Sequence, residues 1–263
     1  MKGRTAPPTM PFMLGLLMLF AIFAGCLGGD DGGDSYSGPI DIVLIQSAVG
    51  GTVSLTKSGG NNTVQNDTFT VTFDLSGTTS GDGDIVSFTL DPGDGSTPIV
   101  TDASEDSVIE HDYWSHGVFE VSITAGDTAG NKRTIYSMVH INFEQRYNDQ
   151  GTDEPDVVWL DAIGPSLNTP LWINLTSIVE NIQGNNFPFV GDTRPVDVTW
   201  KIYDSSNTVI NETTETIADG ESMEFITNTE IPADVRWRLE ITLNDDVTVN
   251  ADSTFSVFYP VHQ

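Results

Sequence analysis

Apolar and polar residues alternate in short runs through most of the chain after about residue 40. The clearest runs lie at residues 41–45, 69–73, 118–123 and 196–203, are rich in Val, Ile, Thr and Phe, and are separated by Gly, Asn, Asp and Pro. Because successive side chains of a strand point to opposite faces, this pattern is typical of strands that bury one face. No stretch after residue 30 sustains a helical period. Short strands at this spacing predict antiparallel β-sandwiches.

The chain is long enough for two such sandwiches. Hydrophobic residues make up 38% of it, including 13 Phe and 5 Trp, so each sandwich can bury a core. The strand pattern stops at Phe143 and resumes at Val157. We therefore predict an all-β protein with two consecutive immunoglobulin-like β-sandwich domains at residues 39–143 and 157–260, joined by a polar linker at 144–156.

The N-terminal segment has the pattern of an export signal. Lys2 and Arg4 precede an apolar run at about residues 11–24. A basic start followed by roughly 7–15 apolar residues is typical of a secretory signal, whereas a membrane-spanning helix needs about 20. Cys26, which directly follows Ala-Gly, resembles the lipobox cysteine of prokaryotic lipoproteins. That resemblance implies that this cysteine becomes the lipid-modified N-terminus of the mature protein.

A lipobox implies a signal peptide at residues 1–25, lipidation at Cys26 and a flexible Gly- and Asp-rich linker at 26–38. A plain secretory signal and an uncleaved anchor are the alternatives, and Phe23 stands where the lipobox usually has Leu. All three predict export, and we expect a protein anchored to the cell membrane and facing outside. Because Cys26 is the only cysteine, no disulfide joins the sandwich strands.

The charge of the chain narrows the choice of partners. It has 38 Asp and Glu residues against 10 Lys and Arg, a net charge of −28. Nucleic-acid binding needs Lys and Arg to neutralise phosphates, so this class of function is excluded. The acidic excess fits a surface adapted to salt, which screens the repulsion between carboxylates. We expect an archaeal source, in which the sequons at Asn61, Asn66, Asn174 and Asn211 would carry N-linked glycans.

Five blocks between residues 82 and 131 resemble the PKD (polycystic kidney disease) domain family. They are a strand at 83–91, the turn at 93–95, the His-Asp-Tyr triplet at 111–113, the run at 117–123 and the turn at 127–131. Their order and spacing match the family, although Leu and Pro replace two of its usual aromatic residues. The resemblance implies an immunoglobulin-like scaffold that contacts proteins or carbohydrates and has no catalytic residues.

The residues of these blocks also predict their own local structure. Gly93 and Gly95 suit a tight turn because glycine tolerates positive φ. We expect Asp94 to accept hydrogen bonds from amides of this turn, and Tyr113 to bury its ring while its hydroxyl finds a backbone partner. Alternation places three side chains of the next strand in the core: Phe119, Val121 and Ile123.

The second domain has a looser resemblance. Its segments at 179–181, 200–203 and 218–222 are similar to those of the adhesion-type sandwich domains called CARDB. A generic immunoglobulin-like or fibronectin-like sandwich is the alternative.

No set of residues indicates catalysis. The four His residues belong to no metalloprotease, esterase or nucleotide-binding motif, so we predict that the protein is not an enzyme. Calcium is the one cofactor with a physical case, because it prefers oxygen ligands. Asp82, Asp84 and Asp127 are the candidate ligands, and the alternative is that they only form turns.

These observations together predict a membrane-anchored surface lipoprotein that acts as a non-catalytic binding, adhesion or spacer module for a protein or polysaccharide. Trp114 and His116 are the candidate contact residues, although Trp114 could instead cover the rim of the core. Two further hypotheses are an accessory subunit of an exported hydrolase or transporter, and an enzyme whose site lies in the second domain.

Overall fold

A computed structural model describes residues 38–59, 62–164, 169–182, 194–229 and 236–260. The predicted signal peptide, Cys26, nearly all of the first linker and the sequon residue Asn61 lie outside these ranges. Every regular element in the described ranges is a strand, which confirms the predicted all-β class. Within them, no helix is long and apolar enough to cross a membrane.

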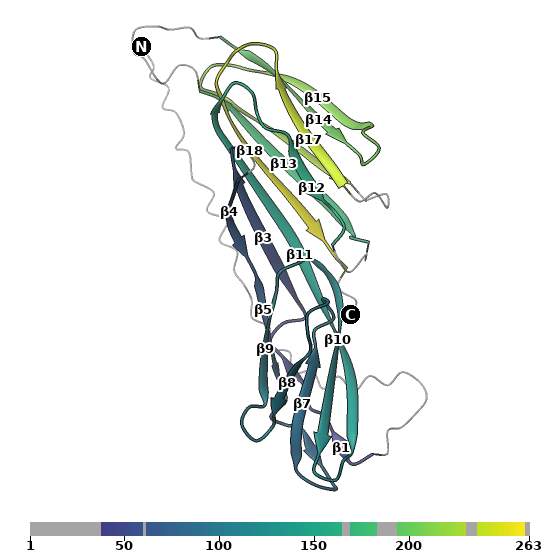
Figure 1. Cartoon of the computed structure of the whole chain (residues 1–263). Coiled ribbons are helices and arrows are strands. Elements are labelled where there is room, and N and C mark those ends of the chain that lie inside the picture. The colour runs from purple at the N-terminus through teal and green to yellow at the C-terminus, as the bar shows by residue number, and fades with distance from the viewer. Residues whose placement is uncertain (1–37, 60–61, 165–168, 183–193, 230–235, 261–263) are drawn as a thin grey trace, which may run out of the picture.

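The strands up to the middle of the chain are β1 (Ile40–Asp41), β2 (Ile45–Gln46), β3 (Gly50–Ser58), β4 (Asn62–Asp67), β5 (Phe69–Asp74), β6 (Thr79–Ser80), β7 (Ile85–Asp91), β8 (Ile99–Asp102), β9 (Val108–Tyr113), β10 (Gly117–Asp127) and β11 (Lys132–Thr152). The later strands are β12 (Val158–Asp161), β13 (Trp172–Asn181), β14 (Val196–Tyr203), β15 (Val209–Ile217), β16 (Ser222–Thr229), β17 (Arg236–Leu243) and β18 (Val249–Phe258). Figure 1 shows them in an elongated arrangement, with β7 to β10 at one end and β14, β15 and β17 at the other.

Two sheets enclose the first core. Strands β2, β5 and β9 form one sheet, and β8, β7, β10 and the first part of β11 form the other. Their inward side chains make one cluster of buried residues. The three predicted core residues belong to it, since Phe119, Val121 and Ile123 are at most 1% exposed. Alternation in this strand therefore predicted its buried face correctly.

A second core lies between the sheet β12-β17-β14-β15 and the strands β16, β13, β18 and the second part of β11. Trp200 and Trp237 are among its largest fully buried side chains. The indole of Trp200 donates a hydrogen bond to Ser177 Oγ at 3.1 Å, so its one polar group is satisfied inside the core. Both halves of the described chain are sandwich-like.

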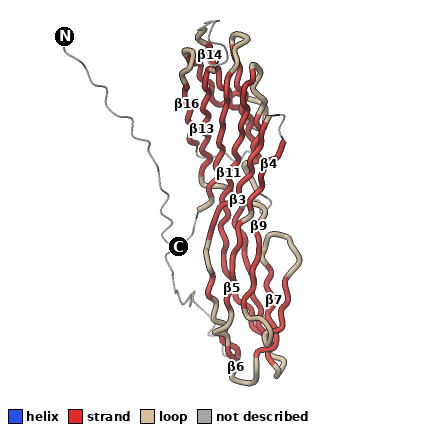
Figure 2. The backbone as a smooth tube through the Cα atoms, turned by 90° about the vertical axis from the view of Figure 1, so that its left-hand side faces the viewer, coloured by secondary structure: helices blue, strands red, loops and turns tan. Residues whose placement is uncertain are grey.

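Strand β11 runs through both halves. Its residues 132–141 pair with β10, residues 143–152 pair with β18, and residues 140–148 pair in parallel with β3. The β11 residues that pair with β3 overlap with those that pair with β10 and with those that pair with β18. Strand β3 must therefore lie along the opposite edge of β11. Strands β10 and β18 therefore follow one another along one edge. Figure 2 shows the strands of both halves lying along the length of the molecule.

The predicted linker at 144–156 is wrong for residues 144–152, which form the second part of β11. Alternation continues there, with Gln145, Tyr147 and Asp149 buried. Two of these three inward residues are polar and are satisfied by partners from other segments: Gln145 Nε2 donates to the Trp159 carbonyl, and Asp149 Oδ2 accepts from the Asp156 amide. Polar residues at inward positions hid the strand pattern.

Candidate functional site

The turn at residues 93–95 is built as predicted. Gly93 and Gly95 have φ values of 76° and 87°, and Asp94 Oδ1 accepts a hydrogen bond from the Ser96 amide at 2.9 Å. The other carboxylate oxygen lies 2.7 Å from His111 Nε2. Burial alone would raise the pKa of Asp94, but hydrogen bonds from Ser96 and His111 outweigh burial and hold it below its usual value.

Tyr113 packs in the core and hydrogen-bonds to the residue before this turn. Its side chain is fully buried and stacks on Phe119 at 5.2 Å, and its hydroxyl donates to the Pro92 carbonyl at 3.1 Å. Both parts of the prediction for Tyr113 are therefore confirmed. Burial raises the pKa of the Tyr113 hydroxyl, so it keeps its hydrogen. These contacts stabilise the fold and leave no free reactive group.

The three predicted calcium ligands are not brought together. Both carboxylate oxygens of Asp127 accept hydrogen bonds, from the amide and side chain of Asn131 and from Ser80 Oγ. The Asn131 side chain is the largest cause of the lowered pKa of Asp127. Asp82 and Asp84 are exposed, and the described residues contain no group of three His, Cys, Asp or Glu that could hold a metal ion. Asp127 acts here as a turn former.

The two candidate contact residues differ in exposure. Trp114 is 64% exposed, as a contact residue would be, but His116 is only 8% exposed. The expectation of an exposed His116 is wrong because its ring stacks on Phe143, with ring centroids 4.7 Å apart, and faces Tyr259. His116 lies just before β10, at the point where β10 and β18 follow one another along β11.

His116 is held as a neutral imidazole. The Tyr259 hydroxyl accepts a hydrogen bond from the Gly164 amide at 3.2 Å and lies 2.8 Å from His116 Nδ1. We assign the hydroxyl as the donor to Nδ1, since one O–H then both donates to the ring and accepts the Gly164 amide, and this assignment places the ring hydrogen on Nε2. A backbone hydrogen bond to Asp161 engages the ring as well. Burial lowers the pKa of His116 to about 4, which Asp161 opposes only in part.

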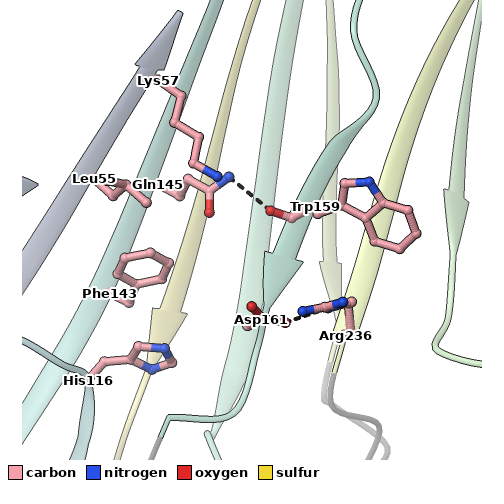
Figure 3. Close-up of a pocket in the computed structure, with 8 residues that line it drawn as sticks. All are labelled: Leu55, Lys57, His116, Phe143, Gln145, Trp159, Asp161 and Arg236. Carbon is pink, nitrogen blue, oxygen red and sulfur yellow. Dashed lines mark hydrogen bonds and ion pairs between the residues drawn. The ribbon is translucent and has the colours of Figure 1, made fainter. Parts of the chain in front are cut away.

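A pocket of about 370 Å³ opens beside this histidine, and we call it the junction pocket. It lies where β3, β11, β12 and β17 come together with the segment before β10 (Figure 3). Its lining residues are Leu55, Lys57, His116, Phe143, Gln145, Trp159, Asp161 and Arg236. The volume is near the lower end of the roughly 300–1,000 Å³ of small-ligand sites.

One side of the junction pocket is apolar and holds a single buried amide. Leu55 and Phe143 lie together on this side in Figure 3. Gln145 is 3% exposed, and its Nε2 donates to the Trp159 carbonyl at 3.0 Å. Its Oε1 accepts no hydrogen bond from another described residue and points into the space beside Phe143 in Figure 3. A ligand donor would satisfy this oxygen.

The opposite side is the edge of β12. This strand pairs only with β17, so its second backbone edge has no neighbouring strand in the described part of the chain. The Trp159 carbonyl on that edge points toward Gln145. Because the N–H and C=O of one residue point the same way in a strand, the Trp159 amide faces the pocket too. The edge therefore offers backbone donors to a ligand.

Charged side chains surround the opening of the junction pocket. Arg236 Nε lies 2.5 Å from Asp161 Oδ1, and both side chains are more than half exposed. Lys57 is half-buried on the other side, and no carboxylate of the described residues forms an ion pair with it. The indole of Trp159 is 45% exposed and lies on the far side of β12 from Leu55 and Phe143 (Figure 3). The charged groups at the opening are thus Lys57 on one side and the Arg236–Asp161 pair on the other.

Sequence reasoning missed all of this pocket except His116. Its residues come from five separate segments, and no two of them form a recognisable motif. The one available signal was Lys57, a cation in an acidic chain that stands where the alternation of Val53 and Leu55 would place the next apolar residue.

The described sequons also differ in exposure. Asn66 is exposed on the edge strand β4. Asn211 is half-buried and donates from Nδ2 to Thr227 Oγ1 at 3.2 Å. Asn174 is half-buried, and its Oδ1 has no hydrogen-bond partner in the described part of the chain. Asn66 is therefore the described sequon residue whose side chain is most open to modification.

Comparison with solved structures gives matches of low similarity. A carbohydrate-binding module of the β-sandwich superfamily is 11% identical, with 85% of this chain and 98% of that chain covered and a TM-score of 0.32. The PKD1 domain of Vibrio anguillarum Epp is 19% identical, with 39% and 95% covered and a TM-score of 0.24. Bacteroides ovatus SGBP-B, in complex with a mixed-linkage heptasaccharide, is 13% identical, with 78% and 51% covered and a TM-score of 0.24.

No curated protein matches the chain. A protein family does match part of it. Residues 55–142, which contain the five blocks, match the PKD domain family, and this match confirms the resemblance.

Proposed function

We propose that the protein is a non-catalytic carbohydrate-binding module, held outside the cell membrane through a lipid on Cys26. The junction pocket is the binding site. The observation that carries this proposal is the buried amide of Gln145, whose Oε1 has no donor among the described residues and points into a pocket with an apolar side. This oxygen borders the pocket, where a ligand hydroxyl can donate a hydrogen bond to it in place of water.

The size and chemistry of the pocket favour a sugar over a protein partner. A stable protein interface buries roughly 800 Å² on each partner, whereas a pocket of about 370 Å³ accommodates only a small group. A sugar ring has apolar C–H faces and a rim of hydroxyls. The faces suit Leu55 and Phe143, and the hydroxyls suit Gln145 Oε1 and the backbone edge of β12.

The same residues argue against catalysis in this pocket. General acid–base chemistry needs groups that are free to exchange protons with the substrate. His116 is buried, with Nδ1 bonded to Tyr259 and a further hydrogen bond to the backbone of Asp161. Asp161 is paired with Arg236. The titratable side chains of the pocket therefore hold the structure together or carry a fixed charge.

Blocking the pocket tests the proposal. Leu55→Trp would fill the pocket, whereas Thr56→Trp adds the same bulk to the opposite face of β3, because neighbouring strand residues point to opposite faces. The full-length protein in detergent is assayed against a panel of oligosaccharides by calorimetry. We expect at least one ligand to bind, Leu55→Trp to weaken its affinity more than about tenfold and Thr56→Trp to leave it unchanged.

Two results would contradict the proposal. If the wild-type protein binds no oligosaccharide of the panel, the proposed function is wrong. If Leu55→Trp leaves binding intact, the junction pocket is not the binding site. Circular dichroism of both variants serves as the control that they remain folded. The anchor has its own test, mass spectrometry of the mature N-terminus, where a lipid-modified Cys26 is expected and an intact Met1 would exclude the anchor.

A further inference from the structure

Ion pairs engage nearly all of the few cations in this chain. Eight Lys and Arg residues follow residue 37. Six of them lie 2.5–3.8 Å from a carboxylate: Arg133, Arg146, Arg194, Lys201, Arg236 and Arg238. Lys57 and Lys132 form no ion pair with a described residue. Lys132 is exposed at the start of β11, but Lys57 is half-buried at the junction pocket.

The position of Lys57 is unusual for such an acidic protein. Lysine is rarely removed from water without a partner, and this chain has 38 Asp and Glu residues that could supply one. Arg236 is paired with Asp161 through Nε, and its guanidinium lies 5.8 Å from the centroid of the Trp159 ring, beyond β12 as seen from Leu55 (Figure 3). With His116 neutral, the residues that line the pocket carry two positive charges and one negative charge. The pocket is therefore locally cationic on a chain of net charge −28.

We propose that the junction pocket selects acidic carbohydrates, with a uronic-acid carboxylate bound by Lys57. This inference rests on the proposed carbohydrate-binding function. The carboxylate would supply the anion that Lys57 lacks, and the sugar ring would lie against Leu55 and Phe143, where a hydroxyl can donate to Gln145 Oε1. A neutral sugar would leave Lys57 half-buried and unpaired, so it would bind more weakly.

The test compares each acidic ligand with its uncharged methyl ester. Uronic-acid trisaccharides from pectin, alginate and hyaluronan are titrated into the full-length protein in detergent, each beside its methyl ester. We expect at least one acid form to bind about tenfold more tightly than its ester, since a charge-assisted hydrogen bond is worth roughly 1.5–3 kcal/mol. Added salt should reduce this preference, because salt screens a partly exposed ion pair.

A matched pair of variants assigns the preference to the pocket. Lys57→Gln and Lys132→Gln change the net charge equally, but only the first lies at the junction pocket. Lys57→Gln should abolish the preference for the acid form while binding of the ester is retained, and Lys132→Gln should leave both unchanged.

Equal binding of acid and ester, or an acid preference that survives Lys57→Gln, would overturn this inference and leave the carbohydrate-binding function standing. Binding of neither the acids, the esters nor any neutral oligosaccharide would overturn the proposed function itself.

Discussion

His116 should make the protein lose stability in mild acid. In the assigned tautomer the Tyr259 hydroxyl donates to His116 Nδ1 and accepts the Gly164 amide. Protonation of Nδ1 would bring its N–H against the hydroxyl hydrogen of Tyr259 in a buried site. The folded state therefore resists protonation, and the pKa of His116 falls from 6.5 to about 4, chiefly through burial.

The sign and size of the effect follow from linkage. Above pH 6.5 the histidine is neutral in both the folded and the unfolded chain and adds no pH dependence. Between pH 6.5 and pH 4 only the unfolded chain binds the proton, so the free energy of unfolding falls as the pH falls. One pKa unit corresponds to about 1.4 kcal/mol, so the shift to a pKa of about 4 removes about 3 kcal/mol by pH 4.

Urea unfolding of the wild type and of His116→Asn, at pH 7 and pH 4, measures this term. Asparagine keeps an acceptor near the position of Nδ1 but does not titrate. The many carboxylates titrate equally in both proteins, so they cancel in the difference between them. We expect the stability advantage of the wild type over His116→Asn to shrink by about 3 kcal/mol between the two pH values. A constant difference would show that His116 is protonated in the folded state or is not buried, and would refute the reasoning.

The PKD-like turn gives two further predictions, both measured by urea unfolding. Gly93→Ala should destabilise the protein by about 3 kcal/mol, whereas Gly95→Ala should destabilise it by only about 1 kcal/mol. Both positions have positive φ, but only a Cβ at residue 93 would meet the Glu120 carbonyl oxygen, at 2.2 Å. Equal losses would show that this close approach is unimportant. Tyr113→Phe should lose about 1–2 kcal/mol, because the buried Pro92 carbonyl loses its donor, and an unchanged stability would mean that water replaces the hydroxyl.

The sequence predicted these turns because their chemistry is local. Glycine permits positive φ and aspartate supplies a side-chain acceptor, and a turn at residues 93–95 uses both. The inward residues of β10 follow equally from a period of two. Such features depend on neighbours within a few positions, so a single sequence contains the information that specifies them.

The continuation of β11 depends on distant residues, and its sequence suggested a linker instead. Gln145 and Asp149 occupy inward positions that are normally apolar, and their partners are the backbone groups of Trp159 and Asp156. Without the fold, a buried glutamine cannot be distinguished from an exposed one. These polar residues made the segment at 144–156 look like a linker, although β11 pairs with β18 over most of it.

The junction pocket and the hidden strand have one physical origin. Gln145 satisfies the backbone edge of β12 with its Nε2, and this bond fixes the amide so that Oε1 faces the pocket. A leucine at this position would extend the apolar pattern and reveal the strand, but it would leave the Trp159 carbonyl unpaired and remove the acceptor from the pocket. The residue that misleads a pattern search is thus the one that gives the pocket its polarity. In this chain, a polar residue at an inward position of β11 marks the place where this strand meets the edge of β12 beside the pocket.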